Sequence, residues 1–145
     1  MIKVEKEAWE TMVAHAEATF PNECCGVMFG KIDTDQENVP KLVTQAVPME
    51  NAYRGAQEDR YELKPEDLLA ADKRARATGL DMIGIFHSHP DCDAYFSKTD
   101  LENSCPWYSF IVISIKGGKF DHANSFLPNA DQTDAPKEEL LWPKS

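Results

Sequence analysis

Two histidines and an aspartate stand at a spacing that could hold a metal ion. His87 and His89 lie two residues apart at the end of an apolar run, and Asp100 follows eleven residues later. Side chains two positions apart on a strand point to the same face, so both imidazoles would project together. Three protein ligands with one open position are typical of a catalytic zinc site. The spacing therefore predicts that His87, His89 and Asp100 are ligands of one zinc ion.

Each of these residues also has an ordinary structural interpretation. His87 and His89 would equally fit two surface histidines at the end of a strand. Ser97 and Asp100, three residues apart, fit a capping box, in which each side chain bonds a backbone N–H at a helix start. The cap and the metal site can coexist, because a carboxylate offers several lone pairs. From these residues alone, both interpretations stay open.

The cysteines predict neither a zinc finger nor a disulfide framework. Cys24 and Cys25 are adjacent, Cys92 and Cys105 stand alone, and no Cys-x-x-Cys pair exists. On a strand, Cys24 and Cys25 would face opposite sides, and we expect at least one of them in the core. Cys92 lies close to the histidines, but a redox or ligand role for it is less favoured than inert packing. We expect reduced thiols.

Composition limits the class of protein and the partners. The chain has 145 residues, of which 42% are hydrophobic and 28% charged, and this is normal for one globular domain over residues 1–145. A formal charge of −10 disfavours nucleic acid, which needs a basic surface. No segment predicts a signal peptide or a membrane span. We therefore expect a cytoplasmic protein that binds neither nucleic acid nor membrane; the oligomeric state is open.

Three segments have the spacing of helices. Apolar side chains recur every three or four positions over residues 5–20, which predicts an amphipathic helix that Pro21 ends. A second helix over residues 65–79 begins at a proline and ends at a glycine, both common at those places. A short third helix is predicted over residues 97–105.

Short apolar runs between these helices predict strands. The runs are residues 24–30, 41–47, 60–63, 82–86, 110–115 and 139–142. A Gly-Gly pair at 117–118 predicts a hairpin between the run at 110–115 and the segment from Phe120. Polar residues predict a turn at 33–38, a loop at 51–59 and a flexible acidic loop at 128–138. Because helices and strands interleave irregularly, the fold class is α/β or α+β with a mixed sheet.

With one further glutamate, the chain resembles a known family. Glu23, then His87 and His89, then Ser97 after seven residues and Asp100 after two more, resembles the JAMM signature of the JAB/MPN metallopeptidases. The segments 21–26, 61–68 and 84–91 are similar to the small prokaryotic branch of that family. The resemblance covers most of the chain from Ile2 to about Phe126. Nothing local distinguishes Glu23 from other glutamates, so the resemblance alone selects it.

The resemblance implies a fold and a role for each residue. The family fold is a mixed sheet flanked by helices and related to cytidine deaminases. His87, His89 and Asp100 would bind zinc with water in the fourth place. Glu23 would act as the general base on that water and pass the proton to the leaving amine. Ser97 would donate a hydrogen bond to the developing oxyanion.

The resemblance also implies a class of substrate. Family members cleave after the C-terminal Gly-Gly of ubiquitin or ubiquitin-like proteins, and small prokaryotic members act on sulfur-carrier proteins. We therefore expect a zinc-dependent peptidase or isopeptidase whose partner is a ubiquitin-like or sulfur-carrier protein ending in Gly-Gly. Residues 60–63 and 51–59 are candidates for lining the groove that takes this tail.

Two alternatives belong to other classes. A non-catalytic MPN-type scaffold would keep the fold and bind partners, but such proteins have typically lost ligands that this chain retains. A deaminase-like hydrolase would need a Cys-x-x-Cys pair and a His-x-Glu, and the sequence has neither.

Overall fold

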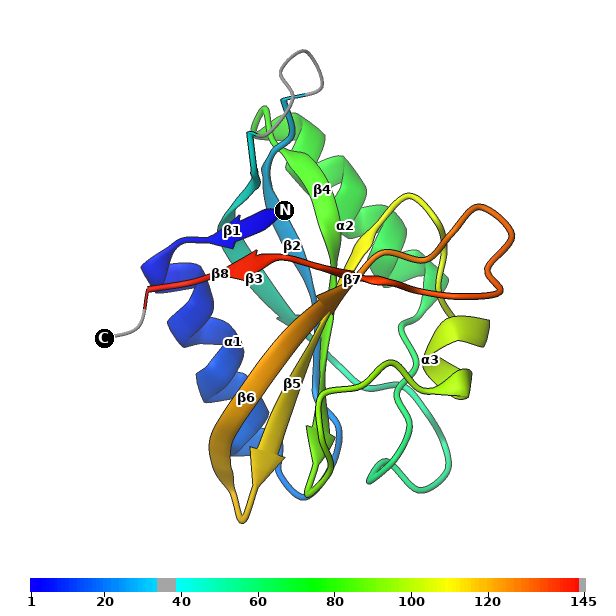
Figure 1. The fold of residues 1–145 in the computed structure, drawn as a ribbon. Helices are drawn as coiled ribbons and strands as arrows, with labels where there is room; N and C mark the ends of the chain where they lie inside the picture. The colour runs from blue at the N-terminus through cyan, green and yellow to red at the C-terminus, as the bar shows by residue number, and fades with distance from the viewer. Residues whose placement is uncertain (34–38, 144–145) are drawn as a thin grey trace.

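The chain folds around one mixed sheet, with its two longer helices on opposite faces (Figure 1). The computed structural model describes residues 1–33 and 39–143. In that part of the chain the sheet has eight strands in the order β7-β6-β5-β4-β2-β3-β1-β8. Strand β4 pairs parallel with β5 and antiparallel with β2, so the sheet is mixed and the fold is α+β, as the sequence predicts.

The strands differ in length from the centre of the sheet to its edges. The five long ones include the central strands, whereas β1, β7 and β8 at or near the two edges span two or three residues. Their bounds are β1 Ile2–Val4, β2 Cys25–Lys31, β3 Lys41–Met49, β4 Asp81–Pro90, β5 Ser109–Lys116, β6 Lys119–Phe126, β7 Lys137–Glu138 and β8 Leu140–Leu141.

Helix α1, Lys6–Thr19, covers one face of the sheet. Its buried stripe contains Ala8, Trp9, Met12 and Ala16, which pack against strand residues such as Phe86. Helix α2, Pro65–Ala77, covers part of the other face, where its buried Ala71 and Ala75 belong to a second core cluster. Both helices confirm the predicted helical segments to within two residues at each end.

The central strand β4 is buried on both faces and therefore reads as a continuous apolar run. Ile83 to His89 are all buried, and the strand continues through both histidines to Pro90. The sequence predicts the apolar run over 82–86 and places the two histidines at the end of that strand, which the structure confirms. The strand extends further because β5 pairs with β4 as far as Pro90 opposite Ile115. The histidines thus lie on regular strand backbone.

Three predictions for the segments between helices and strands are wrong. Residues 60–63 form no strand, since the Arg60 carbonyl and the Glu62 N–H bond to the side chain of Asn51 and not to a neighbouring strand. The predicted short helix is present as α3, Lys98–Glu102, with Ser97 as its N-cap, and only its end is wrong, since it stops three residues before 105.

The third difference concerns the predicted acidic loop at 128–138. Residues 128–136 lie outside helices and strands, but Lys137–Glu138 form β7 and pair with β6. Two contacts hold Glu138 in the sheet. The ammonium group of Lys41 lies 3.0 Å from its carboxylate, and the hydroxyl group of Ser125 donates to the same carboxylate at 2.8 Å.

The remaining local predictions have mixed outcomes. Strand β8 confirms the predicted last strand, and β5 and β6 form the predicted hairpin with Gly117 at a positive φ of 59°. The sequence gives no sign of β1, which is three residues long and pairs with β3 and β8. Most of the predicted turn at 33–38 lies outside the described residues.

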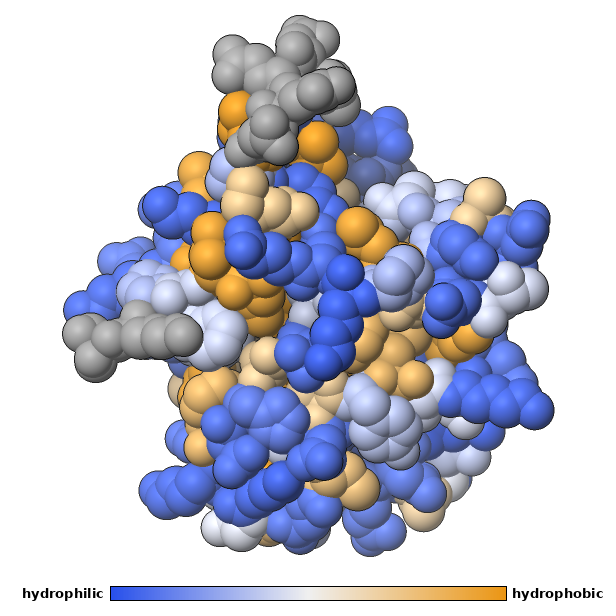
Figure 2. Space-filling model, viewed as in Figure 1, coloured by the Kyte–Doolittle hydropathy of each residue, from blue (hydrophilic) through white to orange (hydrophobic). Residues whose placement is uncertain are grey.

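The surface agrees with the charged composition. Figure 2 shows hydrophilic side chains over much of the visible face, with apolar side chains gathered in smaller areas between them. In the described ranges, no helix combines the length and the apolar character that crossing a bilayer requires.

Close packing of β4 against β5 generates a prediction about stability. A Cβ atom at Gly84 would lie 1.9 Å from the carbonyl oxygen of Ser109, which is backbone and cannot move aside. We expect Gly84→Ala to lower the free energy of unfolding by about 1–3 kcal/mol or more, because the two strands must separate. Urea denaturation followed by circular dichroism measures this loss.

Gly55→Ala is the matched control. A Cβ atom at Gly55 would meet the ring of Tyr53, a side chain that can rotate away. If Gly84→Ala unfolded at the same urea concentration as Gly55→Ala, the close approach of the two strands would be contradicted.

Candidate metal centre

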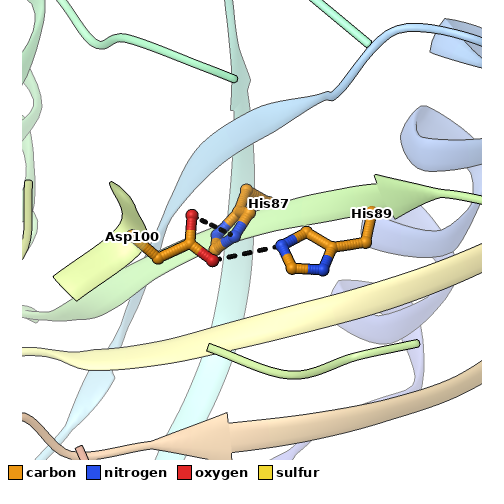
Figure 3. Close-up of side chains that lie close together, drawn as sticks. All are labelled: His87, His89 and Asp100. Atoms are coloured by element: carbon orange, nitrogen blue, oxygen red, sulfur yellow. Dashed lines mark hydrogen bonds and ion pairs between the residues drawn. The ribbon is translucent and has the colours of Figure 1, made fainter. Parts of the chain in front are cut away.

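His87 and His89 lie near the end of β4 and point to the same side of the sheet (Figure 3). The relative exposed area is 0% for His87 and 5% for His89. Their ring centroids are 5.2 Å apart. The structure therefore excludes the interpretation of two surface histidines.

Helix α3 brings Asp100 to the two histidines. Ser97 is the N-cap residue of α3, and its hydroxyl oxygen accepts from the Asp100 N–H at 3.0 Å. The Oδ2 atom of Asp100 accepts from the Ser97 N–H at 3.0 Å, so the predicted capping box is present. The cap aims the carboxylate at the strand end, and the cap and the cluster coexist as the sequence allows.

The three side chains approach one another as ligands of one ion would. Nε2 of His89 lies 3.1 Å from Oδ2 of Asp100, and Nε2 of His87 lies 3.2 Å from Oδ1 (Figure 3). Tetrahedral zinc with bonds of about 2.0–2.1 Å keeps neighbouring ligand atoms roughly 3.3 Å apart. One possible ligand atom from each residue lies within 4.8 Å of the others. The spacing therefore fits a zinc ion.

His87 has ring nitrogens that the protein leaves unsatisfied. Among the described residues, neither Nδ1 nor Nε2 of His87 has a hydrogen-bond partner, since the contact with Asp100 lacks hydrogen-bond geometry. A buried polar atom without a partner costs about 1–3 kcal/mol. An ion bound at Nε2 would remove part of this cost, which is a second reason to regard the cluster as a metal site.

The protonation states suit a cation. Burial alone would raise the pKa of Asp100, but His87, His89 and the Ser97 N–H together hold it well below its usual range. Burial lowers the pKa of His87, although the charge of Asp100 opposes this effect. At neutral pH the cluster therefore offers one carboxylate and a neutral His87, the forms in which these groups bind metals.

Contacts outside the cluster orient the two rings. Nδ1 of His89 lies 2.9 Å from the carbonyl oxygen of Asp93, which can only accept, so Nδ1 carries the proton and Nε2 is free to face Asp100. Such a second bond fixes the tautomer of a metal-binding histidine. The ring of Tyr61 stacks on His87 with centroids 4.5 Å apart and planes at 24°. The rings are thus held in place by neighbours.

Glu23 lies beside the cluster and is buried. It precedes β2, and the next residue, Cys24, bonds to Ser88 through its N–H, 2.8 Å from the Ser88 hydroxyl oxygen, and through its carbonyl at 3.2 Å. These bonds hold Glu23 next to the two histidines that flank Ser88. Glu23 lines a shallow hollow together with His89.

The carboxyl group of Glu23 is unusually basic. Its relative exposed area is 3%, and within the described chain its Oε1 atom has no hydrogen-bond partner. Burial, followed by the charges of Asp100 and Asp59, raises the pKa of Glu23 to about 9. A cation in the cluster would stabilise the carboxylate and lower this value. Glu23 can therefore hold or release a proton according to the charge beside it.

Ser97 lines the same hollow as Glu23. Its oxygen accepts the capping bond from Asp100, and its own hydroxyl proton can still be donated to a group in the hollow. The structure therefore brings all five predicted residues, Glu23, His87, His89, Ser97 and Asp100, to one place.

The cysteines lie outside the metal cluster. All four belong to the described part of the chain and are free thiols. Cys24 and Cys25 are buried in different core clusters, as their alternation on a strand predicts. Cys92 is exposed and lines the hollow near His89, but the cluster of three ligand atoms does not include it.

Sequence reasoning missed the parts of the site that come from its surroundings. Tyr61 belongs to a predicted strand but instead packs on His87. Ser88, between the two histidines, anchors Cys24 on the opposite face of β4. Strand alternation could have suggested that role, whereas the stacking of Tyr61 depends on a loop whose course has no local signal. The residues 60–63 also line a separate hollow of about 330 Å³.

Comparison with known proteins agrees with this geometry. The chain is 32% identical over 128 residues to a desampylase of Haloferax volcanii, covering 83% of this chain and 86% of that protein. It is 28% identical over 117 residues to a CysO-cysteine peptidase of Mycobacterium tuberculosis, covering 80% of this chain and 75% of the relative.

Solved structures share the fold. A protein of Desulfitobacterium hafniense superposes with a TM-score of 0.83 at 31% identity, covering 100% of this chain and 94% of the other. A JAB1/MPN domain protein of Archaeoglobus fulgidus superposes with a TM-score of 0.60 at 13% identity, covering 99% and 98%, and this likeness shows the fold alone. The family of prokaryotic homologues of the JAB domain matches residues 5–126. With this match over most of its length, the chain belongs to the prokaryotic JAB-domain family.

Proposed function

We propose that this protein is a zinc-dependent peptidase or isopeptidase that cleaves the bond after the C-terminal Gly-Gly of a ubiquitin-like or sulfur-carrier protein. His87, His89 and Asp100 would hold one zinc ion per chain, Glu23 would be the general base, and Ser97 would stabilise the oxyanion.

The buried histidine His87 carries the proposal. Its ring is fully buried and lies 3.2 Å from a carboxylate, yet neither ring nitrogen forms a hydrogen bond within the described chain. A purely structural cluster of this kind would be expected to close its hydrogen bonds. A cluster built for a cation instead leaves a nitrogen lone pair directed at the ion.

Glu23 would move the proton during hydrolysis. When bound, zinc supplies a water ligand of pKa about 7 and polarises a carbonyl group. The Glu23 carboxylate would take a proton from the attacking water and later give it to the leaving amine. Its buried position suits this exchange, since a carboxyl group with a raised pKa holds a proton more tightly than a solvated one.

Ser97 would act on the carbonyl oxygen of the substrate. Its hydroxyl lines the hollow that Glu23 and His89 also line, and its proton is not used by the capping bond. Hydrogen-bond donors directed at developing negative charge typically lower the activation barrier of such a reaction by about 2.7–4 kcal/mol.

The relatives support the class of substrate. They include a desampylase and a CysO-cysteine peptidase, and small prokaryotic members of the family resemble this chain in size. A Gly-Gly tail has no side chains and can enter a narrow passage to the site. Residues 60–63 line a hollow, and the ring of Tyr61 among them stacks on His87, so we assign this hollow to the tail.

Replacing Glu23 tests the proposal. Glu23→Gln should lower kcat by about 10²–10⁴-fold, because the amide cannot accept the proton of water. It should still bind one zinc ion, since the three ligands are unchanged. The substrates are Gly-Gly-terminated carriers joined to cysteine or to lysine, with products measured by intact mass and zinc by elemental analysis.

Glu10→Gln is the matched control, because Glu10 is an exposed glutamate on α1. It should cleave as fast as the parent. Equal cleavage by Glu23→Gln and the parent would show that Glu23 is not the base. A folded parent that binds no zinc and cleaves no conjugate would instead favour the non-catalytic scaffold.

Proton release on zinc binding gives an independent measurement. With its pKa raised to about 9, Glu23 is protonated at pH 7.5 in the metal-free protein. Zinc lowers this pKa, so binding should release about one proton more from the parent than from Glu23→Gln. The difference should fall to about half near pH 9 and vanish roughly one to two pH units higher, where Glu23 is already ionised in the metal-free protein.

Titration calorimetry in two buffers of different ionisation enthalpy measures the number of protons released. Equal release from the parent and from Glu23→Gln at pH 7.5 would contradict the protonated state of Glu23. It would leave the zinc site itself unaffected.

A further inference from the structure

One asparagine side chain organises the loop that follows β3. The Asn51 amide donates two hydrogen bonds, to the carbonyl oxygen of Glu23 at 3.1 Å and to that of Arg60 at 3.0 Å. Its Oδ1 atom accepts two more, from the N–H groups of Tyr53 and Glu62, both at 3.1 Å. The side chain therefore uses its two donors and two acceptor positions in full.

These bonds hold the backbone of Glu23. The N–H of Glu23 donates to the carbonyl oxygen of Gln57 at 2.6 Å, and its carbonyl accepts from Asn51. Gln57 is itself tied to the loop, because its side-chain amide donates to the carbonyl oxygens of Asn51 at 3.0 Å and Tyr53 at 2.9 Å. The loop thus holds Glu23 from both sides, where the sheet pairing of β2 has not yet begun.

Two further bonds of Asn51 hold the backbone around Tyr61, which packs against His87. Arg60 and Glu62 flank Tyr61, so Asn51 fixes the backbone on both sides of it. The ring of Tyr61 is 7% exposed and stacks on His87. One amide therefore connects the backbone of the proposed base with the residue that packs against a proposed ligand.

We propose that Asn51 is a positioning residue that sets the place of the Glu23 carboxyl group relative to the metal site. This inference rests on the proposed function for its catalytic consequence. The Oε1 atom of Glu23 has no hydrogen-bond partner in the described chain, so its place depends on the backbone that carries it. A displacement of about 1 Å at a reacting group can lower a rate by about 10²-fold.

The metal ligands should be far less dependent on Asn51. His87 and His89 come from the central strand β4, and Asp100 is fixed by the capping box of α3. None of the four Asn51 side-chain bonds described above goes to these three residues. Loss of Asn51 should therefore affect proton transfer more than metal binding.

Two variants separate the donor bonds from the acceptor bonds. Asn51→Ala removes all four bonds. Asn51→Asp has nearly the same shape and keeps the two acceptor bonds, but it places a carboxylate oxygen against the carbonyl groups of Glu23 and Arg60. We expect both variants to lower kcat by about 10–100-fold, with KM and zinc affinity within about threefold of the parent.

Hydrogen exchange in the metal-free protein provides a readout that does not depend on activity. The amide of Glu23 should exchange at least tenfold faster in both Asn51 variants, because the Glu23 backbone loses the bond from Asn51 that holds it against the carbonyl oxygen of Gln57. The amides of β4 should keep their protection, since the central strand does not depend on the loop.

Asn129→Ala is the matched control. Asn129 also organises a turn, with a donor bond to the Thr133 hydroxyl at 2.9 Å and acceptor bonds from the N–H groups of Thr133 and Asp134 at 2.9 and 3.3 Å. These three bonds stay within the turn and reach no proposed catalytic or metal-binding residue. Its loss should leave kcat and the exchange of the Glu23 amide unchanged.

Each outcome decides one question. Parent-like kcat and parent-like exchange at Glu23 in folded Asn51→Asp would overturn the positioning role, and this near-isosteric variant decides if Asn51→Ala does not fold. A parent that binds zinc but cleaves no conjugate would overturn the proposed function. Faster exchange of the Glu23 amide in the Asn51 variants would still support the positioning role of Asn51. Equal loss of kcat in Asn129→Ala would show a general effect of loop destabilisation and overturn the specific role of Asn51.

Discussion

The antiparallel pairing of β2 with β4 is the constraint on which the site depends. It places Cys25 opposite His87, and the additional bonds between Cys24 and Ser88 extend the contact to the residue after Glu23. A shift of this pairing by one residue would turn both histidines to the other face of the sheet. Close packing of β4 on both faces opposes such a shift, because each side chain of the strand would move to the opposite face and meet a space shaped for another residue. The geometry of the site therefore follows from the packing of the core.

The site places polar groups where a stable core would avoid them. His87 is buried without a hydrogen bond in the described chain, and Asp100 and Glu23 are buried carboxyl groups, of which the second has its pKa raised by burial and then by the charge of the first. The protein stabilises one charge and suppresses the other: the capping N–H of Ser97 and the two imidazoles keep Asp100 ionised, whereas the pKa of Glu23 rises to about 9. Two carboxyl groups in different states are suited to different tasks, one to hold a cation and one to exchange a proton.

The sequence predicts the parts of this site that depend on local chemistry. The spacing of His87, His89 and Asp100 and the capping box of Ser97 need only strand alternation and the geometry of one helical turn. Glu23 was selected by family resemblance alone, because its burial comes from a loop remote in sequence. Residues 60–63 were predicted as a strand because their composition suits one, and the error arises from Asn51, nine residues away from Arg60, which takes the hydrogen bonds that a neighbouring strand would need. Hydrogen bonds between a side chain and backbone groups that are distant in sequence leave no periodic pattern in the sequence.

The two halves of the site are built by different means, and this has a consequence for how such a site can change. The proposed ligands stand on a central strand and a capped helix, whose places are fixed by core packing and a local motif. The proposed base stands just before a strand and is held by a loop through an asparagine side chain. Alterations in the loop can therefore move the base while the ligand cluster stays intact, whereas alterations in the strand would disturb the core as well. Metal binding should accordingly be the more robust property of this fold, and the placing of the base the more easily adjusted one.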